Sequence, residues 1–129
     1  MPILRQLLGR TPSGPKSRVR NFIANKALGT ELCDIHENVL SPGVTIPWHF
    51  HTTEEVIVVL EGGGECRTGE GCDFYHAGDV IILPARMKHS LRNSGRVPIR
   101  QLCFFPDDPG TQFLEGEYPG QTVDVFNAG

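Results

Sequence analysis

From Arg18 onward the chain consists of short apolar runs separated by glycine or proline about every ten residues. Many runs contain valine, isoleucine and aromatic residues, a pattern typical of an all-β sandwich or barrel. We predict strands at residues 18–24, 31–40, 44–51, 55–60, 65–68, 73–76, 80–83, 89–93 and 99–105. Little helix is expected, because only residues 2–8 combine a helical pattern with a stop signal, Gly9.

The length of 129 residues suits one domain. A breaker cluster at residues 11–15 separates an N-terminal arm, residues 1–17, from a predicted barrel at residues 18–106. Residues 107–129 contain several prolines and glycines, and we predict an extended C-terminal strap there.

The run Val56–Leu60 lacks the apolar–polar alternation of a half-exposed strand. A continuous run of this kind predicts that both faces of the strand are covered. One face would line the barrel interior, and the N-terminal arm or a second subunit would cover the other.

Charge is distributed unevenly, since residues 1–30 hold six basic and no acidic residues while the whole chain has a net charge of −3. A nucleic-acid-binding arm or a transit peptide could have this composition. Without interleaved aromatic residues, however, we favour a basic arm packed on an acidic barrel, its own or a partner's. No apolar run is long enough to span a membrane, and no secretory signal is visible. We expect a soluble, cytoplasmic protein with no nucleic-acid or membrane partner.

Two histidines and a glutamate lie close together in the sequence, and a third histidine follows later. His49 and His51 are two apart in a predicted strand, so both side chains project to the same face. Glu55 follows a polar turn that would place the next strand beside the first, and His89 begins a later strand. Imidazole and carboxylate groups are the usual ligands of first-row transition metals. His36 and His76 stand alone, and we interpret both as structural or surface residues.

Nine residues resemble the two conserved motifs of the cupin superfamily. The first motif is matched by Gly43, His49, His51, Glu55 and Gly62, and the second by Gly78, Pro84, His89 and Asn93. The resemblance to small single-domain cupins implies a double-stranded β-helix, or jelly-roll, barrel. It also implies one divalent transition metal, Fe, Mn, Ni, Cu or Zn, with His49, His51, Glu55 and His89 as ligands. Arg86 departs from the second motif, where the family has glycine; if that position needs positive φ, the backbone is strained there.

Strand parity predicts which side chains surround the metal. We expect an apolar pocket; its lining residues would be Ile57, Val59, Met87, Leu91, Gln101 and Cys103. The register of the last strand stays open, because Arg100 and Leu102 could face inward in place of Gln101 and Cys103. No catalytic residue can be named from the sequence.

The leading hypothesis is a metal-dependent enzyme, of dioxygenase type, acting on a small organic acid, diketone or phenol that chelates the metal. The first alternative is a redox-neutral isomerase or lyase for a sugar or sugar acid. The second is a small-ligand-binding cupin without turnover. Fold alone does not choose among them.

The chain is expected to form a homodimer. Val56, Val58 and Leu60 would face away from the metal, and Trp48 and Phe50 would lie on the same outer sheet surface. Such a patch would exceed what monomers usually expose.

Overall fold

The computed structural model describes residues 3–5, 12, 14 and 16–114. The predicted helix at residues 2–8 lies mostly outside the described residues, and residues 3–5 have no regular secondary structure. The predicted strap lies outside them beyond residue 114.

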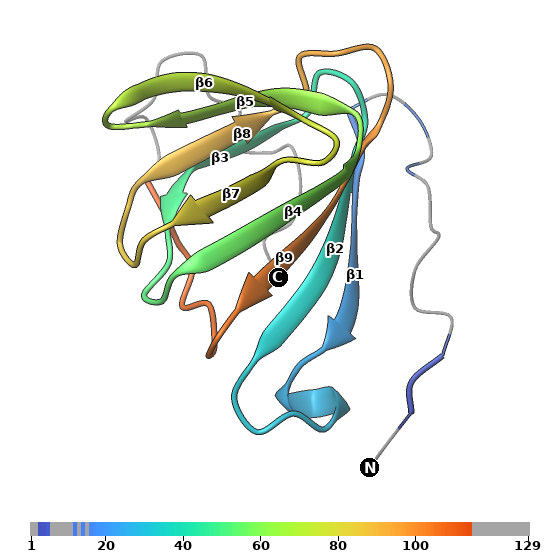
Figure 1. Cartoon of the computed structure of the whole chain (residues 1–129), viewed down its shortest axis with the longest axis vertical. Helices are drawn as coiled ribbons and strands as arrows, with labels where there is room; N and C mark the ends of the chain where they lie inside the picture. Colours follow the sequence, from blue (N-terminus) through green and yellow to red (C-terminus); the bar gives the residue numbers. More distant parts are fainter. Residues whose placement is uncertain (1–2, 6–11, 13, 15, 115–129) are drawn as a thin grey trace.

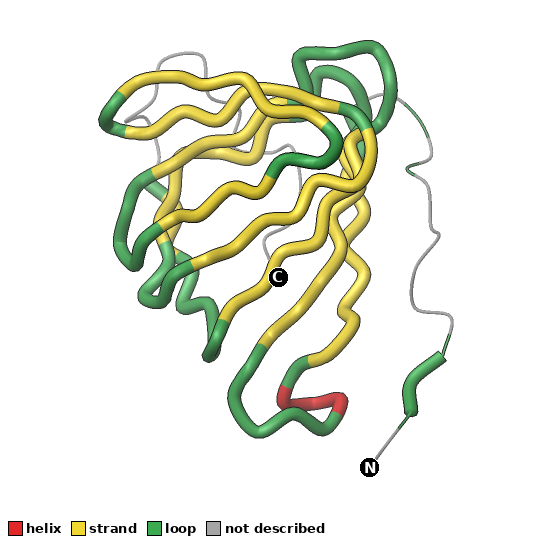
Figure 2. Tube along the Cα trace, viewed as in Figure 1, coloured by secondary structure: helices red, strands yellow, loops and turns green. Residues whose placement is uncertain are grey.

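Ten strands and one short 3-10 helix make up the described part of the chain (Figure 2). The strands are β1 (Arg18–Ala24), β2 (Asp34–Leu40), β3 (Thr45–Phe50), β4 (Glu55–Glu61), β5 (Gly63–Thr68), β6 (Gly71–His76), β7 (Val80–Leu83), β8 (His89–Arg92), β9 (Ile99–Phe105) and β10 (Gln112–Phe113). The 3-10 helix, η1 (Lys26–Leu28), connects β1 to β2. Each of the nine predicted strands is present, and β10 and η1 are additions that no pattern in the sequence predicted.

The strands form two antiparallel five-stranded sheets that face each other. One sheet has the order β1-β2-β9-β4-β7, and the other has the order β10-β3-β8-β5-β6 (Figure 1). This all-β arrangement confirms the predicted double-stranded β-helix. In the described part of the chain, no helix is both long and apolar enough to cross a membrane.

Alternating strand residues fill the space between the sheets. On β4, Glu55, Ile57 and Val59 are buried, whereas Val58 is 37% exposed. On β9, Gln101 and Cys103 point inward and are fully buried, which settles the register that the sequence left open. The core therefore lies between the sheets, and one end of it carries the histidines.

One structural prediction was wrong: β3 and β4 do not lie side by side. They belong to different sheets, because the turn at residues 51–54 carries the chain across the barrel. Trp48 and Phe50 consequently cannot share an outer surface with Val56, Val58 and Leu60. The apolar neighbours of Val58 come instead from β7 and β9.

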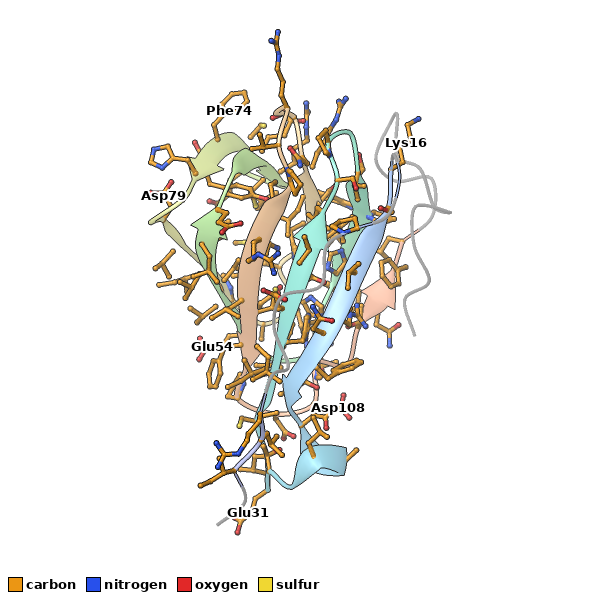
Figure 3. All side chains as sticks on the ribbon, turned by 90° about the vertical axis from the view of Figure 1, so that its right-hand side faces the viewer. Lys16, Glu31, Glu54, Phe74, Asp79 and Asp108 are labelled. Carbon is orange, nitrogen blue, oxygen red and sulfur yellow. The ribbon has the colours of Figure 1, made fainter. Side chains whose placement is uncertain are left out.

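An exposed apolar surface does lie on the outside of the β4-containing sheet. We call it the outer face, and its members are Val58, Val80, Ile82 and Phe104. Val80 and Ile82 are 55% and 65% exposed, and β7 and β9 flank β4 in the sheet. On the other sheet, Phe74 projects away from the β5–β6 hairpin (Figure 3).

Two of the motif residues support the backbone. The buried Asn93 amide donates hydrogen bonds to the carbonyl oxygens of Leu40 and Val97, both at 2.9 Å, and so ties together three segments. Gly62 has a φ of +76°, and a Cβ there would lie 2.5 Å from the carbonyl oxygen of Pro98. A larger residue at position 62 would be both strained and obstructed.

Candidate metal centre

Three histidines and one glutamate meet at one end of the core. His49 on β3 pairs directly with His89 at the start of β8, so their rings lie next to each other. His51 follows β3, and Glu55 begins β4 in the opposite sheet. All four side chains are buried, and the ligand nitrogens of the three histidines lie within 4.8 Å of one another.

The second nitrogen of each imidazole is held by a neighbour. Nδ1 of His49 lies 2.6 Å from the carbonyl oxygen of Pro47, and Nδ1 of His89 lies 2.9 Å from that of Met87. A carbonyl oxygen only accepts hydrogen bonds, so Nδ1 carries the proton in both rings. Nδ1 of His51 lies 2.9 Å from Oγ1 of Thr111. In a neutral ring with its proton on Nδ1, the lone pair is on Nε2, which is the arrangement of a metal-binding histidine.

The Glu55 carboxylate lies against these Nε2 atoms. Its Oε1 is 3.2 Å from Nε2 of His51 and 3.4 Å from Nε2 of His89. Among the described residues, the buried Nε2 of His89 has no hydrogen-bond partner. A buried nitrogen lone pair that faces a carboxylate oxygen is unfavourable unless a cation lies between them. The four residues therefore fit a divalent metal ion with three nitrogen donors and one oxygen donor.

The charge states of these groups agree with metal binding. Burial lowers the pKa of His49 well below its usual value, and the nearby His89 and His51 lower it further, so the ring is neutral at pH 7. Burial alone would raise the pKa of the Glu55 carboxyl, but contact with His51 and His89 holds it well below its usual range. Metal ligation requires these two states, neutral imidazole and ionised carboxylate.

A cavity of about 60 Å³ opens onto His49, His51 and Glu55. Its apolar lining consists of Phe22, Ile46, Leu91, Phe105, Pro109 and Phe113. Of the six predicted pocket residues, the structure places only Leu91 at this cavity. Ile57, Val59 and Cys103 lie in the hydrophobic core, Met87 packs against that core from outside, and Gln101 accepts a hydrogen bond from Tyr75.

The cavity is not wholly apolar, contrary to the expectation from the sequence, because β1 and β2 supply a polar wall. That wall consists of Arg18, Arg20, Asp34, His36 and Asn38. Sequence reasoning missed these residues because it treated the arginines as part of a dispersed basic arm. Their spacing of two in a predicted strand, which places both side chains on one face, was the available signal.

The two histidines outside the cluster differ from each other. His36 is buried, stacks on Phe105 with ring centroids 5.6 Å apart, and lies 3.1 Å from Asp34 Oδ1. Burial lowers the pKa of His36. His76 is exposed on the surface. The structural or surface interpretation holds for His76, whereas His36 also lines the cavity.

Comparison with known proteins agrees with this geometry. A family model described as a cupin domain matches residues 37–105, which is more than half of the chain. The chain belongs to the cupin family. The match includes all four candidate ligands and ends before β10, and it begins after β1.

Individual proteins that resemble the chain share less than a third of its residues in the matched regions. A gentisate 1,2-dioxygenase from Ralstonia sp. is 29% identical over 125 residues, which cover 91% of this chain but only 35% of that enzyme's length. A conserved protein with a double-stranded β-helix domain from Klebsiella pneumoniae has a TM-score of 0.69 at 22% identity, covering 81% of this chain and 90% of that one. An oxalate oxidase structure has a TM-score of 0.72 at 20% identity, covering 86% and 63%. The likeness to the two structures shows the fold alone.

The departure from the cupin motif at Arg86 lies beside the candidate metal centre. Arg86 has a φ of +67°, so the position that the family gives to glycine does require the left-handed region. Its backbone N–H donates to the carbonyl oxygen of His51 at 2.8 Å. The exposed arginine therefore keeps the turn and its contact with a candidate ligand, at the expense of backbone strain.

Proposed function

We propose that this cupin is a metal-dependent enzyme of dioxygenase type that acts on a small organic substrate able to chelate the metal. The observation that carries the proposal is the convergence of three buried imidazoles and one carboxylate at the end of a cavity. A divalent transition metal bound there would supply Lewis-acid and redox chemistry. O₂ would be the oxidant, and both of its atoms would enter the product.

The protein's own residues would prepare the site in two ways. The Nδ1 contacts of His49, His51 and His89 orient the rings before the metal binds, so little reorganisation is needed. Phe105 and Phe113 form aromatic walls beside the histidines, with Phe113 5.2 Å from His49 and Phe105 4.8 Å from His51 between ring centroids. These rings would limit access of water to the reacting substrate.

Similarity favours oxygenase chemistry over the redox-neutral alternative. The gentisate 1,2-dioxygenase match extends over nearly the whole of this chain. Because this chain spans about a third of that enzyme, its substrate and assembly do not carry over, and only the reaction class is proposed here.

Metal analysis of the purified protein tests the proposal first. We expect about one equivalent of a first-row metal per chain, and we expect His51→Ala to lose most of it while circular dichroism stays unchanged. His76→Ala is the matched control, because it removes an exposed imidazole remote from the cluster. Full occupancy in His51→Ala would contradict the ligand assignment.

Oxygen consumption then tests the reaction class. Metal-loaded protein is incubated with small hydroxy acids, keto acids and phenols in an oxygen electrode cell. Uptake of O₂ that depends on both metal and substrate would support the proposal. Substrate conversion without O₂ uptake would favour an isomerase or lyase instead.

A further inference from the structure

We propose that Arg18 and Arg20 make this site selective for organic acids, by binding a substrate carboxylate across the cavity from the metal-binding histidines. This inference rests on the proposed function, because it assigns the substrate class of the same site. It goes beyond the cupin motifs, since both arginines precede the region that matches the family.

Strand geometry directs both arginines into the cavity. They occupy alternate positions on β1, and both line the same cavity as His49, His51 and Glu55. Among the described strands, β1 lies at the edge of its sheet and pairs with β2 alone, with Arg18 opposite Leu40 and Arg20 opposite Asn38. Figure 3 shows the molecule from this side, with β1 and β2 next to each other. Two guanidinium groups on one strand face provide the planar donors that match a carboxylate.

Neighbouring groups limit the movement of both side chains. Nε and Nη2 of Arg18 donate to Oδ1 of Asn38 at 3.1 and 3.0 Å. The guanidinium carbon of Arg20 lies 5.8 Å from the ring centroid of Phe22, close enough for a cation–π contact. A guanidinium that is already oriented loses less entropy when it binds an anion.

The charged side chains around the cavity balance one another until a divalent metal binds. Among the described lining residues, the arginines provide two positive charges, and Asp34 and Glu55 provide two negative charges. Burial lowers the pKa of Arg18 to about 9, so it remains charged at neutral pH. His36 is neutral there, because burial lowers its pKa. A bound divalent metal would then leave two uncompensated positive charges, and a substrate anion would offset them.

The dimensions of the cavity indicate a small acid. Its volume of about 60 Å³ is room for only a few water molecules. That space suits an acid of few heavy atoms with one oxygen group toward the metal and its carboxylate toward the arginines. Ile46 and Leu91 would contact the carbon atoms between the two groups.

Matched acid and amide pairs test this inference by calorimetry on the metal-loaded protein. The probes are glycolate with glycolamide and pyruvate with pyruvamide, which differ mainly in charge within each pair. We expect at least one acid to bind tenfold or more tightly than its amide. Arg20→Gln and Arg18→Gln should each remove most of that preference, because each loses a charged hydrogen bond to the carboxylate. Amide binding should stay within about twofold, because a neutral amide makes no charge-assisted hydrogen bond with either arginine.

Controls separate substrate contact from structure. Arg96→Gln removes an exposed arginine in the β8–β9 connection and should change neither the affinity for the acid nor that for the amide. Arg20→Lys keeps the charge but not the planar donors, so it should retain part of the preference. Melting temperature and metal content are measured for every variant.

The outcomes distinguish the inference from the proposed function. If the protein binds metal but no acid binds better than its amide, or the preference survives in both glutamine variants, the inference is wrong while the metal site stands. If the wild-type protein binds no metal, the proposed function itself fails.

Discussion

Thr111→Val should weaken metal binding about tenfold. Thr111 Oγ1 is the only side-chain atom among the three Nδ1 partners, because His49 and His89 contact backbone carbonyl oxygens that no substitution removes. Valine has nearly the shape of threonine but cannot hydrogen-bond to His51. Loss of a hydrogen bond to the second nitrogen of a metal-binding histidine typically lowers metal affinity about 10- to 100-fold, or about 1.4–2.8 kcal/mol.

The structure places the expected effect at the lower end of that range. Thr111 belongs to the exposed segment before β10, so water can replace its hydroxyl at His51. The ring of His51 also keeps its contacts with Phe105 and His89, which limit its rotation. We therefore expect a tenfold loss and an unchanged number of sites.

Competition with a fluorescent zinc chelator at pH 7.5 measures the affinity. Thr111→Ser retains the hydroxyl and should bind zinc within about twofold of the wild type. If Thr111→Val binds as tightly as the wild type, Thr111 does not orient His51. If Thr111→Ser loses as much as Thr111→Val, the methyl group matters and the hydrogen-bond argument is refuted.

Three further predictions concern backbone strain, pH and assembly. Arg86→Gly should stabilise the protein by about 0.5–1 kcal/mol in thermal melts, because relieving the left-handed backbone at Arg86 gains about 1–2 kcal/mol, which exceeds the entropic cost of glycine. Arg86→Ala keeps a side chain in the left-handed region and should give no gain. Folding lowers the pKa of His36, so the unfolded chain binds a proton on this residue more readily than the folded one. The free energy of unfolding of the metal-free protein should therefore fall as the pH drops below about 6.5, and it should fall less steeply in His36→Gln. If urea titrations give both proteins the same dependence of unfolding free energy on pH, this prediction is refuted. Light scattering should give twice the mass of one chain, because the outer face is apolar and exposed. Ile82→Lys on the outer face should give monomers, whereas Val97→Lys, at an exposed valine elsewhere, should leave the dimer intact.

Sequence reasoning succeeded where the signal was local. The nine strands follow from apolar runs between glycine and proline, and the shared inward direction of His49 on β3 and His51 just after it follows from residue parity. The departure from the motif at Arg86 identified a position where strain was expected if φ is positive, and its φ is indeed +67°. These features depend on a few neighbouring residues, so the conformational preferences of those residues are enough to predict them.

The errors came from relations between sheets. The alternation of side chains along a strand predicts that His51 and Glu55 face inward, but it does not predict that the turn between them crosses to the other sheet. The expected patch with Trp48 and Phe50 failed for that reason, whereas the cluster was unaffected, since inward side chains from opposite sheets still meet. Similarly, β10 is two residues long and pairs with β3 through Phe50 and His49, a contact that only the folded barrel brings about.

The same distinction separates what cupins share from what would make this one specific. The candidate ligands lie within residues 37–105, the region that matches the family. The groups that would contact a substrate or tune the ligands, Arg18 and Arg20 on β1 and Thr111 before β10, lie on either side of that region. β1 and β10 are edge strands, so they can change with little effect on the inner strands that position the candidate ligands. Substrate choice in this protein is therefore expected to depend on β1 and β10, and a family match alone cannot supply it.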